Sequence, residues 1–348
     1  MAKTQLIKVD KKNPDREKIR QAAKVIKNGG LVAFPTETVY GLGANALDEN
    51  AAKKIYCAKG RPQDNPLIVH VCSIKQLDYL VKEVNQKALL LMEKFWPGPL
   101  TIIFDKTDII PSGTTGGLDT VAIRMPRHPV ALSIIEQSGV PIAAPSANIS
   151  GRPSPVCAQD VLEDMDGRID LILDSGACTV GVESTVIDLS EDVPMILRPG
   201  GLTKEDIESV LGNVRLDPGL QEGQRPKSPG QKYRHYAPKA HMTLIEGPLE
   251  FQVKTINELA KNSVKKGLDV GIMATAQTRH LYRFGKVISV GDRNAPLTIS
   301  SNLFLVLRKF DRMGVSEIFA ESISKEGLGL AVMNRLYKAA AYNIIKGT

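Results

Sequence analysis

Apolar residues recur with two different periods along the first 212 residues, and the two periods together predict an α/β fold. The apolar stripe at 19–26 predicts a helix that Asn13 caps and Pro14 begins. The short apolar run at 31–34, stopped by Pro35, predicts a buried strand. Further strands are predicted at 66–71, 100–104, 120–124, 141–144, 171–173, 185–188 and 195–197, and further helices at 48–58, 86–95, 128–138, 157–165 and 203–211.

This pattern stops at residues 213–240, which are rich in Pro, Gly, Gln and charged residues and have no apolar period. We therefore expect a first domain at 1–212, a linker at 213–240 and a second, smaller α/β domain at 241–348. In the second domain, strands are predicted at 242–245, 270–273 and 317–320, and helices at 250–266, 299–312 and 332–345.

Composition agrees with a soluble cytoplasmic protein. Hydrophobic residues make up 43% of the 348 residues and charged residues 24%, which allows a sizeable core. No apolar run is long enough to span a bilayer, and the first residues lack the apolar stretch of a secretory signal. The four cysteines are far apart in the sequence, so we expect small buried hydrophobic residues in a reducing compartment rather than a metal site.

The net charge of +7 is unevenly distributed. Residues 1–212 hold 24 basic and 27 acidic residues, whereas residues 213–348 hold 21 basic and 11 acidic ones. This basic excess either attracts polyanions such as RNA and nucleotides or simply makes the surface soluble.

Six polar clusters adjoin predicted strands, where the functional loops of α/β sheets lie, and a seventh lies in the predicted linker. In the first, glycines after Thr36 would let a ligand approach the backbone, or else the segment is a capped turn. The last includes Tyr236, which either closes over a ligand or packs between the domains. In chain order, the clusters are 35–43, 59–70, 120–126, 143–155, 181–185, 197–201 and 228–238.

Several basic side chains in these clusters suit an anionic ligand. Lys59 and Arg61 match an oligophosphate, although a solvated basic turn is the alternative. Arg124 ends a buried strand and needs an anionic partner, either a ligand carboxylate or an internal Asp or Glu. His70 alone is typical of a satisfied strand histidine.

The common catalytic fingerprints are missing from the sequence. It contains no Walker A motif, no G-x-G-x-x-G between a strand and a helix, no H-E-x-x-H and no G-x-S-x-G. The residues themselves therefore indicate only an α/β protein with a cationic, hydroxyl-rich cleft.

Taken together and in order, the clusters resemble the YrdC-like family in its two-domain form, the threonylcarbamoyl-AMP synthases. The matching pieces are Pro35-Thr-Glu-Thr-Val-Tyr-Gly-Leu-Gly-Ala, Lys59-x-Arg61, Asn65-Pro-Leu, Arg124-Met-Pro, Ser146-x-Asn148, Gly181 to Thr185, Arg198-Pro-Gly and Lys232-Tyr-Arg-His-Tyr-Ala-Pro. The resemblance implies a twisted open sheet with a concave cationic cavity, followed by a smaller Rossmann-like α/β/α domain. It also implies that the linker forms a lid over the active site.

The resemblance further implies a nucleotidyltransferase. Such an enzyme joins L-threonine, bicarbonate and ATP into threonylcarbamoyl-AMP and pyrophosphate, with Mg²⁺ on the ATP phosphates. A separate complex then transfers the threonylcarbamoyl group to tRNA. Two alternatives stay open: an RNA-binding module, and carbamoyl transfer as in hydrogenase-maturation proteins, whose acylphosphatase unit and zinc-finger cysteines are missing here.

The resemblance assigns roles to particular positions of this sequence. The catalytic group comprises Lys59, Arg61, Ser146 and Asn148. ATP is assigned to Arg61, Asn65, Thr120, Ala144, Ser154, Arg198 and Tyr236. Threonine is assigned to Thr36, His70, Arg124, Ser146 and Ser184. The resemblance does not identify a general base for the reaction: His70, water and bicarbonate are the candidates.

Overall fold

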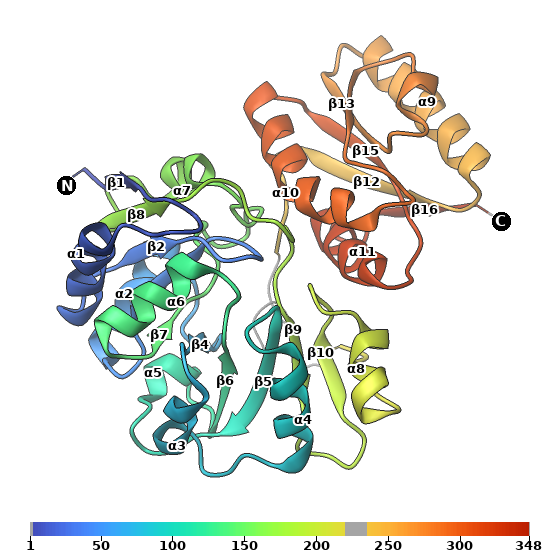
Figure 1. The fold of residues 1–348 in the computed structure, drawn as a ribbon. Helices are drawn as coiled ribbons and strands as arrows, with labels where there is room; N and C mark the ends of the chain where they lie inside the picture. Colours follow the sequence, from blue (N-terminus) through green and yellow to red (C-terminus); the bar gives the residue numbers. More distant parts are fainter. Residues whose placement is uncertain (1–2, 220–234, 348) are drawn as a thin grey trace. The chain divides into compact units, whose positions relative to one another are not determined.

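The computed structural model of the protein describes residues 3–219 and 235–347, which form two compact units (Figure 1). The first unit comprises residues 1–150 and 154–233, and the second comprises 151–153 and 234–348. Most of the expected linker, residues 220–234, lies outside the described residues.

The first unit is built on a mixed sheet of eleven strands in the order β1-β8-β2-β3-β7-β4-β6-β5-β9-β10-β11. Both parallel and antiparallel pairs occur. Loops that follow some strands and loops that precede others therefore lie at the same edge of the sheet. The strands are β1 (Gln5–Lys8), β2 (Val32–Phe34), β3 (Gly41–Asn45), β4 (Ile68–His70), β5 (Leu100–Asp105), β6 (Thr120–Arg124), β7 (Ile142–Ala143), β8 (Leu171–Asp174), β9 (Thr185–Asp188), β10 (Met195–Arg198) and β11 (Arg215–Leu216).

Helices cover this sheet and bury its apolar side chains. Ile19 and Ile26 of α1 pack into a core with Ile134 and Ile135 of α6. The cap of α1 differs from the prediction: Asp15, not Asn13, accepts hydrogen bonds from the first helical N–H groups. The helices are α1 (Arg16–Lys27), α2 (Glu49–Lys59), α3 (Leu77–Leu80), α4 (Gln86–Phe95), α5 (Ser112–Thr115), α6 (Pro129–Ser138), α7 (Ala158–Met165), α8 (Lys204–Leu211) and the 3₁₀ turn η1 (Ile74–Gln76).

The glycines after Thr36 form a strand, which the apolar pattern did not predict. β3 pairs antiparallel with β2, so that Phe34 lies opposite Gly41. A Cβ atom at Gly43 would lie 2.7 Å from the ring of Phe34. Gly43 is therefore needed for packing under an aromatic ring.

The second unit is a parallel sheet of five strands in the order β14-β13-β15-β12-β16. The predicted helix at 332–345 is wrong in its second half: the helix ends at Ala339, and Ile344–Lys346 pair with β12 as an edge strand. The strands are β12 (His241–Glu246), β13 (Val270–Ala274), β14 (Lys286–Ser289), β15 (Glu317–Glu321) and β16 (Ile344–Lys346). The helices are α9 (Leu249–Lys265), α10 (Pro296–Met313), α11 (Leu328–Ala339) and the 3₁₀ turn η2 (Arg279–Leu281).

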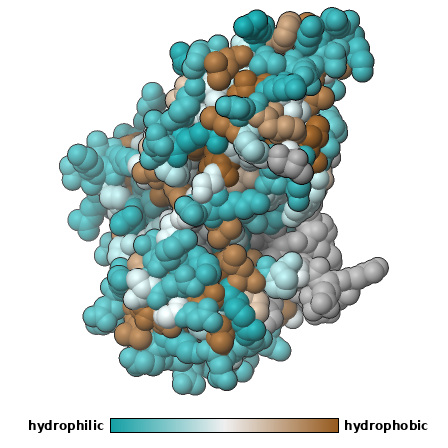
Figure 2. Space-filling model, turned by 90° about the vertical axis from the view of Figure 1, so that its right-hand side faces the viewer, coloured by the Kyte–Doolittle hydropathy of each residue, from teal (hydrophilic) through white to brown (hydrophobic). Residues whose placement is uncertain are grey.

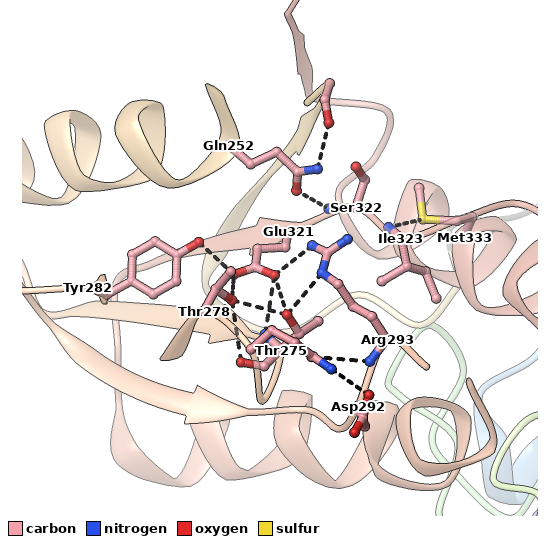
Figure 3. A network of polar contacts seen from close by, with 12 residues as sticks. Gln252, Thr275, Thr278, Tyr282, Asp292, Arg293, Glu321, Ser322, Ile323 and Met333 are labelled. Atoms are coloured by element: carbon pink, nitrogen blue, oxygen red, sulfur yellow. Dashed lines mark hydrogen bonds and ion pairs between the residues drawn. The ribbon is translucent and has the colours of Figure 1, made fainter. Parts of the chain in front are cut away.

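A buried carboxylate, Glu321, ties together the carboxyl ends of β13 and β15 (Figure 3). Its Oε1 accepts hydrogen bonds from Thr278 and, at 2.6 Å, from Tyr282. Its Oε2 accepts from Thr275 N at 3.2 Å, from Thr275 Oγ1 at 2.8 Å and from Arg293 Nη2 at 2.7 Å. Both oxygens are thus satisfied by the protein itself. Burial and the nearby carboxylate raise the pKa of Tyr282, which stays a hydrogen-bond donor.

The surface carries apolar residues scattered among hydrophilic ones on the face drawn in Figure 2. Leu297 and Tyr342 are examples of exposed large side chains. Among the described residues, no helix is both long and apolar enough to cross a membrane.

Candidate functional site

Five neighbouring strands of the first unit carry one row of side chains across the sheet. The register pairs His70 with Arg124, Arg124 with Thr101, Thr101 with Val186, and Val186 with Arg198. Residues directly opposite each other on adjacent strands point to the same face of a sheet. His70, Arg124 and Thr101 therefore share one face. The β9–β10 register shifts between Ile196 and Arg198, but Arg198 reaches this face because its Nη2 donates to Ser184 Oγ, which lies 2.8 Å from Thr101 Oγ1. Roughly 19 Å separates the first and fifth strands of the row.

Two loops of the first unit lie over this row and are bonded to each other. Val180 N donates to Glu37 O at 2.8 Å, and Gly181 N donates to Thr38 O at 3.1 Å. One loop follows β2, whereas the other precedes β9. Because the sheet is mixed, functional loops come from both ends of strands, and not only from the carboxyl ends as in a parallel sheet.

Arg124 binds the first of these loops. Its Nη1 donates to Thr38 Oγ1 at 2.9 Å, and its Nη2 forms an ion pair with Glu37 Oε1 at 2.8 Å. Its Nε donates to Gly98 O at 3.2 Å. Of the two partners that the sequence left open for Arg124, the internal acidic residue is thus present in this structure, as Glu37. Beside this ion pair, Thr36 Oγ1 is hydrogen-bonded to Thr38 Oγ1 at 2.7 Å.

His70 is buried and neutral at physiological pH. Desolvation and then the charge of Arg124 lower its pKa to about 3. Its ring meets Phe34 edge-on with centroids 6.3 Å apart, and its Nδ1 lies 3.2 Å from Ile68 O. An imidazole with so low a pKa is a poor proton acceptor at neutral pH, so this state of the protein does not favour His70 as the base.

Arg198 occupies the other end of the row. Its Nη2 donates to Ser184 O at 2.9 Å and to Ser184 Oγ at 3.2 Å, and the same hydroxyl lies 2.8 Å from Thr101 Oγ1. A Cβ atom at Gly200 would lie 2.3 Å from the backbone of the 184–185 segment, so only glycine lets the chain pass here.

Ser154, assigned to ATP by the resemblance, is joined to the loop before β9. Its hydroxyl donates to Glu183 Oε1 at 2.5 Å. The two residues are both buried, and Glu183 is the immediate neighbour of Ser184. This bond connects Ser154 with the Arg198 end of the row.

A second group of predicted residues surrounds the end of α2. Lys59, the last residue of this helix, donates to the backbone oxygen of Ser146 and, at 2.6 Å, to that of Asn148. Ser146 Oγ donates to Asn148 Oδ1 at 2.6 Å. Backbone bonds from Ala147 N to Tyr40 O, at 2.8 Å, and from Tyr40 N to Pro155 O, at 2.9 Å, hold this group beside the loop after β2.

Arg61 and Lys59 are buried, with only 9% and 2% of their surface exposed, which excludes the solvated basic turn. Arg61 Nη2 donates to Asn65 O at 3.1 Å and to Pro66 O at 2.9 Å. The side-chain Oδ1 of buried Asn65 has no hydrogen-bond partner among the described residues. Both cations are thus held by backbone oxygens within a folded segment, and their contact with phosphate stays a prediction.

Two predicted ATP residues of the first unit, Thr120 and Ala144, lie outside these contacts or contribute no polar side chain. Thr120 starts β6 opposite Asp105, four residues from Arg124, and lines a separate pocket of about 160 Å³ with Asn85. Ala144 is buried and donates its N–H to Ile68 O at 2.9 Å. The structure therefore does not bring Thr120 to the row's Arg124 end.

Tyr236 belongs to the second unit. Its ring stacks on Phe304 with centroids 5.3 Å apart, and the guanidinium of Arg335 lies 5.6 Å from its centroid. Its φ of 61° is the left-handed conformation, which is unusual for a tyrosine. The role of the linker as a lid stays a prediction.

Sequence reasoning missed Glu37, Thr38, Thr101 and Glu183 as members of this constellation. Glu37 and Thr38 lie inside the motif that was recognised, so the motif itself was the signal. Thr101 is one hydroxyl in an otherwise apolar strand, and only the register shows what it faces.

The cysteines are unpaired, and they are less buried than predicted: Cys57 is exposed, Cys72 and Cys157 are half-buried, and only Cys178 is buried. Within residues 3–219 and 235–347, no group of three or more His, Cys, Asp or Glu side chains is placed to hold a metal ion. The constellation contains four buried cations and several hydroxyls, and its binding of an anionic ligand stays a prediction.

Known proteins resemble the chain along nearly its whole length. The Sua5/YciO/YrdC family model, described as "Telomere recombination", matches residues 24–200, and that of the threonylcarbamoyl-AMP synthase C-terminal domain matches residues 202–341. The threonylcarbamoyl-AMP synthase of Pyrococcus abyssi is 53% identical over 94% of this chain and 96% of its own length. That of Bacillus subtilis is 49% identical over 97% of each.

The solved structures agree with these sequence matches. The crystal structure of P. abyssi Sua5 complexed with L-threonine matches with a TM-score of 0.95 and 51% identity, covering 99% of this chain and 100% of that one. Since both the family models and such relatives span the two units, the chain belongs to the threonylcarbamoyl-AMP synthase family in its two-domain form.

Proposed function

We propose that this protein forms threonylcarbamoyl-AMP and pyrophosphate from L-threonine, bicarbonate and ATP. The observation that carries the proposal is the row of side chains from His70 through Arg124 and Thr101 to Arg198. It sets two buried guanidiniums and several hydroxyls on one face, beside a further pair of buried cations, Lys59 and Arg61. The relatives that share nearly the whole chain carry the name of this activity.

The residue types suit the two steps of this reaction. Carbamate formation needs the amine of threonine next to bicarbonate, and adenylation needs the carbamate oxygen in line with the α-phosphorus of ATP. Both steps depend on positioning and charge neutralisation more than on a protein nucleophile. We assign threonine to Arg124, Thr36, His70, Ser146 and Ser184, and the ATP phosphates to Lys59, Arg61, Asn65, Ser154 and Arg198.

Mg²⁺ would enter this site bound to the phosphates of ATP. Glu37 is paired with Arg124, and Glu183 accepts a hydrogen bond from Ser154. A metal ion bound to the phosphates of ATP therefore suits this cationic site better than one bound by protein carboxylates. The ion would neutralise charge on the departing pyrophosphate.

The test is pyrophosphate release by the purified full-length protein, followed with each substrate omitted in turn. We expect release to require ATP, L-threonine and bicarbonate together, and an AMP adduct of threonylcarbamate to appear by mass spectrometry. Release that continues unchanged without threonine would contradict the proposal. Chelation of Mg²⁺ with EDTA should stop release, and added Mg²⁺ should restore it.

We further propose that the product passes to a tRNA threonylcarbamoyl-transfer complex in the cytoplasm, where tRNA is modified. The basic excess after residue 212 supports at most a weak contact with RNA. RNA affinity that is tight without ATP and falls steeply with salt would instead favour the RNA-binding alternative.

A further inference from the structure

Glu37 is a buried carboxylate with an incomplete set of partners. It is 4% exposed, and its Oε1 forms the 2.8 Å ion pair with Arg124 Nη2. Its Oε2 has no hydrogen-bond partner among the described residues. A buried carboxylate oxygen without a donor is unfavourable, so its retention points to a donor that arrives with a ligand.

The neighbours of Glu37 leave Arg124 as the charged group that faces it among the described residues. His128 also interacts with it, but burial and Lys11 lower the pKa of His128 to about 4, so this imidazole is neutral at pH 7. Cys178 interacts with it too, and burial raises the pKa of its thiol, which keeps the thiol protonated. Both side chains are uncharged, and neither is hydrogen-bonded to Glu37 Oε2, so the donor is still missing among the described residues.

We propose that Glu37 binds the ammonium group of the amino-acid substrate while Arg124 binds the carboxylate of the same molecule. The inference rests on the proposed function and names the group that recognises the amine. In an α-amino acid, roughly 2.5 Å separates the nitrogen from the carboxyl carbon. An adjacent guanidinium and carboxylate therefore match the two charges of a zwitterion.

Arg124 keeps donors available for this role. A guanidinium has five N–H groups. Gly98 O and Thr38 Oγ1 accept from Nε and Nη1, and Glu37 faces Nη2. The N–H groups left over can reach a ligand carboxylate, and Glu37 Oε2 then accepts from the amine.

The same contact prepares the amine for reaction. One proton moves from the substrate nitrogen to Glu37 Oε2, which leaves a neutral amine and a carboxylic acid. The nitrogen lone pair then forms the N–C bond to the carbon of bicarbonate. The C–OH bond of bicarbonate breaks, and water leaves with a second amine proton. The product of this step is the carbamate that ATP adenylates.

The experiment compares two ligands on the full-length protein by isothermal titration calorimetry. The first is L-threonine, and the second is the 2,3-dihydroxybutyrate of the same configuration, in which a hydroxyl replaces the amine. We expect wild type to bind L-threonine more tightly, and Glu37→Gln to lose at least about 10-fold in affinity for L-threonine but little for the hydroxy acid. At saturating substrates, kcat should fall by about 100-fold or more.

Glu321→Gln is the matched control, because it alters the other arginine-paired buried carboxylate, in the second unit. It should leave the ratio of the two affinities unchanged. Equal losses for both ligands in Glu37→Gln, or no loss, would overturn the role of Glu37 while leaving the proposed function intact. A wild-type protein that does not bind L-threonine would overturn both proposals. If Glu37→Gln does not fold, wild-type affinities that are equal for the two ligands would overturn the inference.

Discussion

Two arginine–glutamate pairs with buried carboxylates, one in each unit, differ in how many hydrogen bonds their carboxylates accept. Glu321 accepts five hydrogen bonds from four residues, including Arg293 Nη2 at 2.7 Å. Glu37 forms its ion pair with Arg124 through Oε1, and neither of its oxygens accepts a hydrogen bond from the described residues. The two ion pairs are nearly equal in length, but both oxygens of Glu321 accept hydrogen bonds, whereas Oε2 of Glu37 has no donor among the described residues.

The difference separates a structural role from a binding role. A fully satisfied network rigidifies the elements that it joins, here the carboxyl ends of β13 and β15. An incompletely satisfied buried charge is kept at a cost to stability, and such costs are concentrated at functional sites. The second unit thus fills, with its own side chains, the edge at which parallel sheets commonly bind ligands.

The largest effect is expected for Arg124→Ala. It removes the proposed carboxylate ligand and leaves Glu37 buried without a cation, so threonine-dependent pyrophosphate release should fall by about 1,000-fold or more. The free energy of unfolding should fall by about 3–5 kcal/mol in urea titrations. The double variant Arg124→Ala/Glu37→Gln should recover part of the stability and none of the activity. Recovery of activity would show that the pair is only structural.

Arg61→Ala should also abolish most turnover, with a raised KM for ATP measured by pyrophosphate release. Because Arg61 is buried and donates to two backbone oxygens, we expect a stability loss of about 1–3 kcal/mol as well. Arg61→Lys keeps the charge and is the control. An unchanged KM for ATP in both variants would remove Arg61 from the phosphate group.

Arg293→Ala tests the pair of Arg293 and Glu321, whose carboxylate is fully hydrogen-bonded. It leaves Glu321 buried beside its hydroxyl donors, so the second unit should lose about 2–3 kcal/mol, less than a fully buried pair because Arg293 is 22% exposed. Hydrogen exchange should rise in β13 and β15, while kcat for threonylcarbamoyl-AMP formation stays within about two-fold of wild type. A loss of activity without a loss of stability would give the second unit a direct part in the reaction.

The smallest effect concerns pH. The pKa of His70 is about 3 in the folded protein and 6.5 in its ordinary state, so the unfolded chain binds its proton first as pH falls. The stability that this histidine contributes is complete above pH 6.5 and is lost at roughly 1 kcal/mol per pH unit below it. His70→Gln should flatten urea-unfolding free energies between pH 6.5 and 4. An unchanged slope would mean that His70 is already charged in the fold.

Local patterns predicted much of the first unit and the residue types of its site. The helix predicted at 203–211 is present as α8, Lys204–Leu211, and Arg124 ends a strand as expected. The burial of Lys59 and Arg61 was not predictable, because a Gly- and Pro-bounded segment of charged residues has the same composition on a surface and around a ligand.

The register between strands and the pairing of the edge strand β16 also could not be predicted from the sequence. The partnership of Thr101 with Arg124 depends on which residues of β5 and β6 lie opposite each other, and no short pattern determines this. Ile344–Lys346 form a strand because β12 offers a free edge, which outweighs the helical period at 332–345.

The chain enters the second unit twice, first with the three residues Gly151–Pro153 and again from residue 234. Within that unit, Ala237 N donates to Gly151 O at 2.9 Å, and Arg308 Nη2 donates to Pro153 O at 2.6 Å. A truncation that stops near residue 212 would therefore remove the partners of the tripeptide that directly precedes Ser154. The fragment 1–212 would thus lack the contacts that hold residues 151–153 in place. A loss of activity in this fragment would therefore not show that the second unit takes part in the reaction.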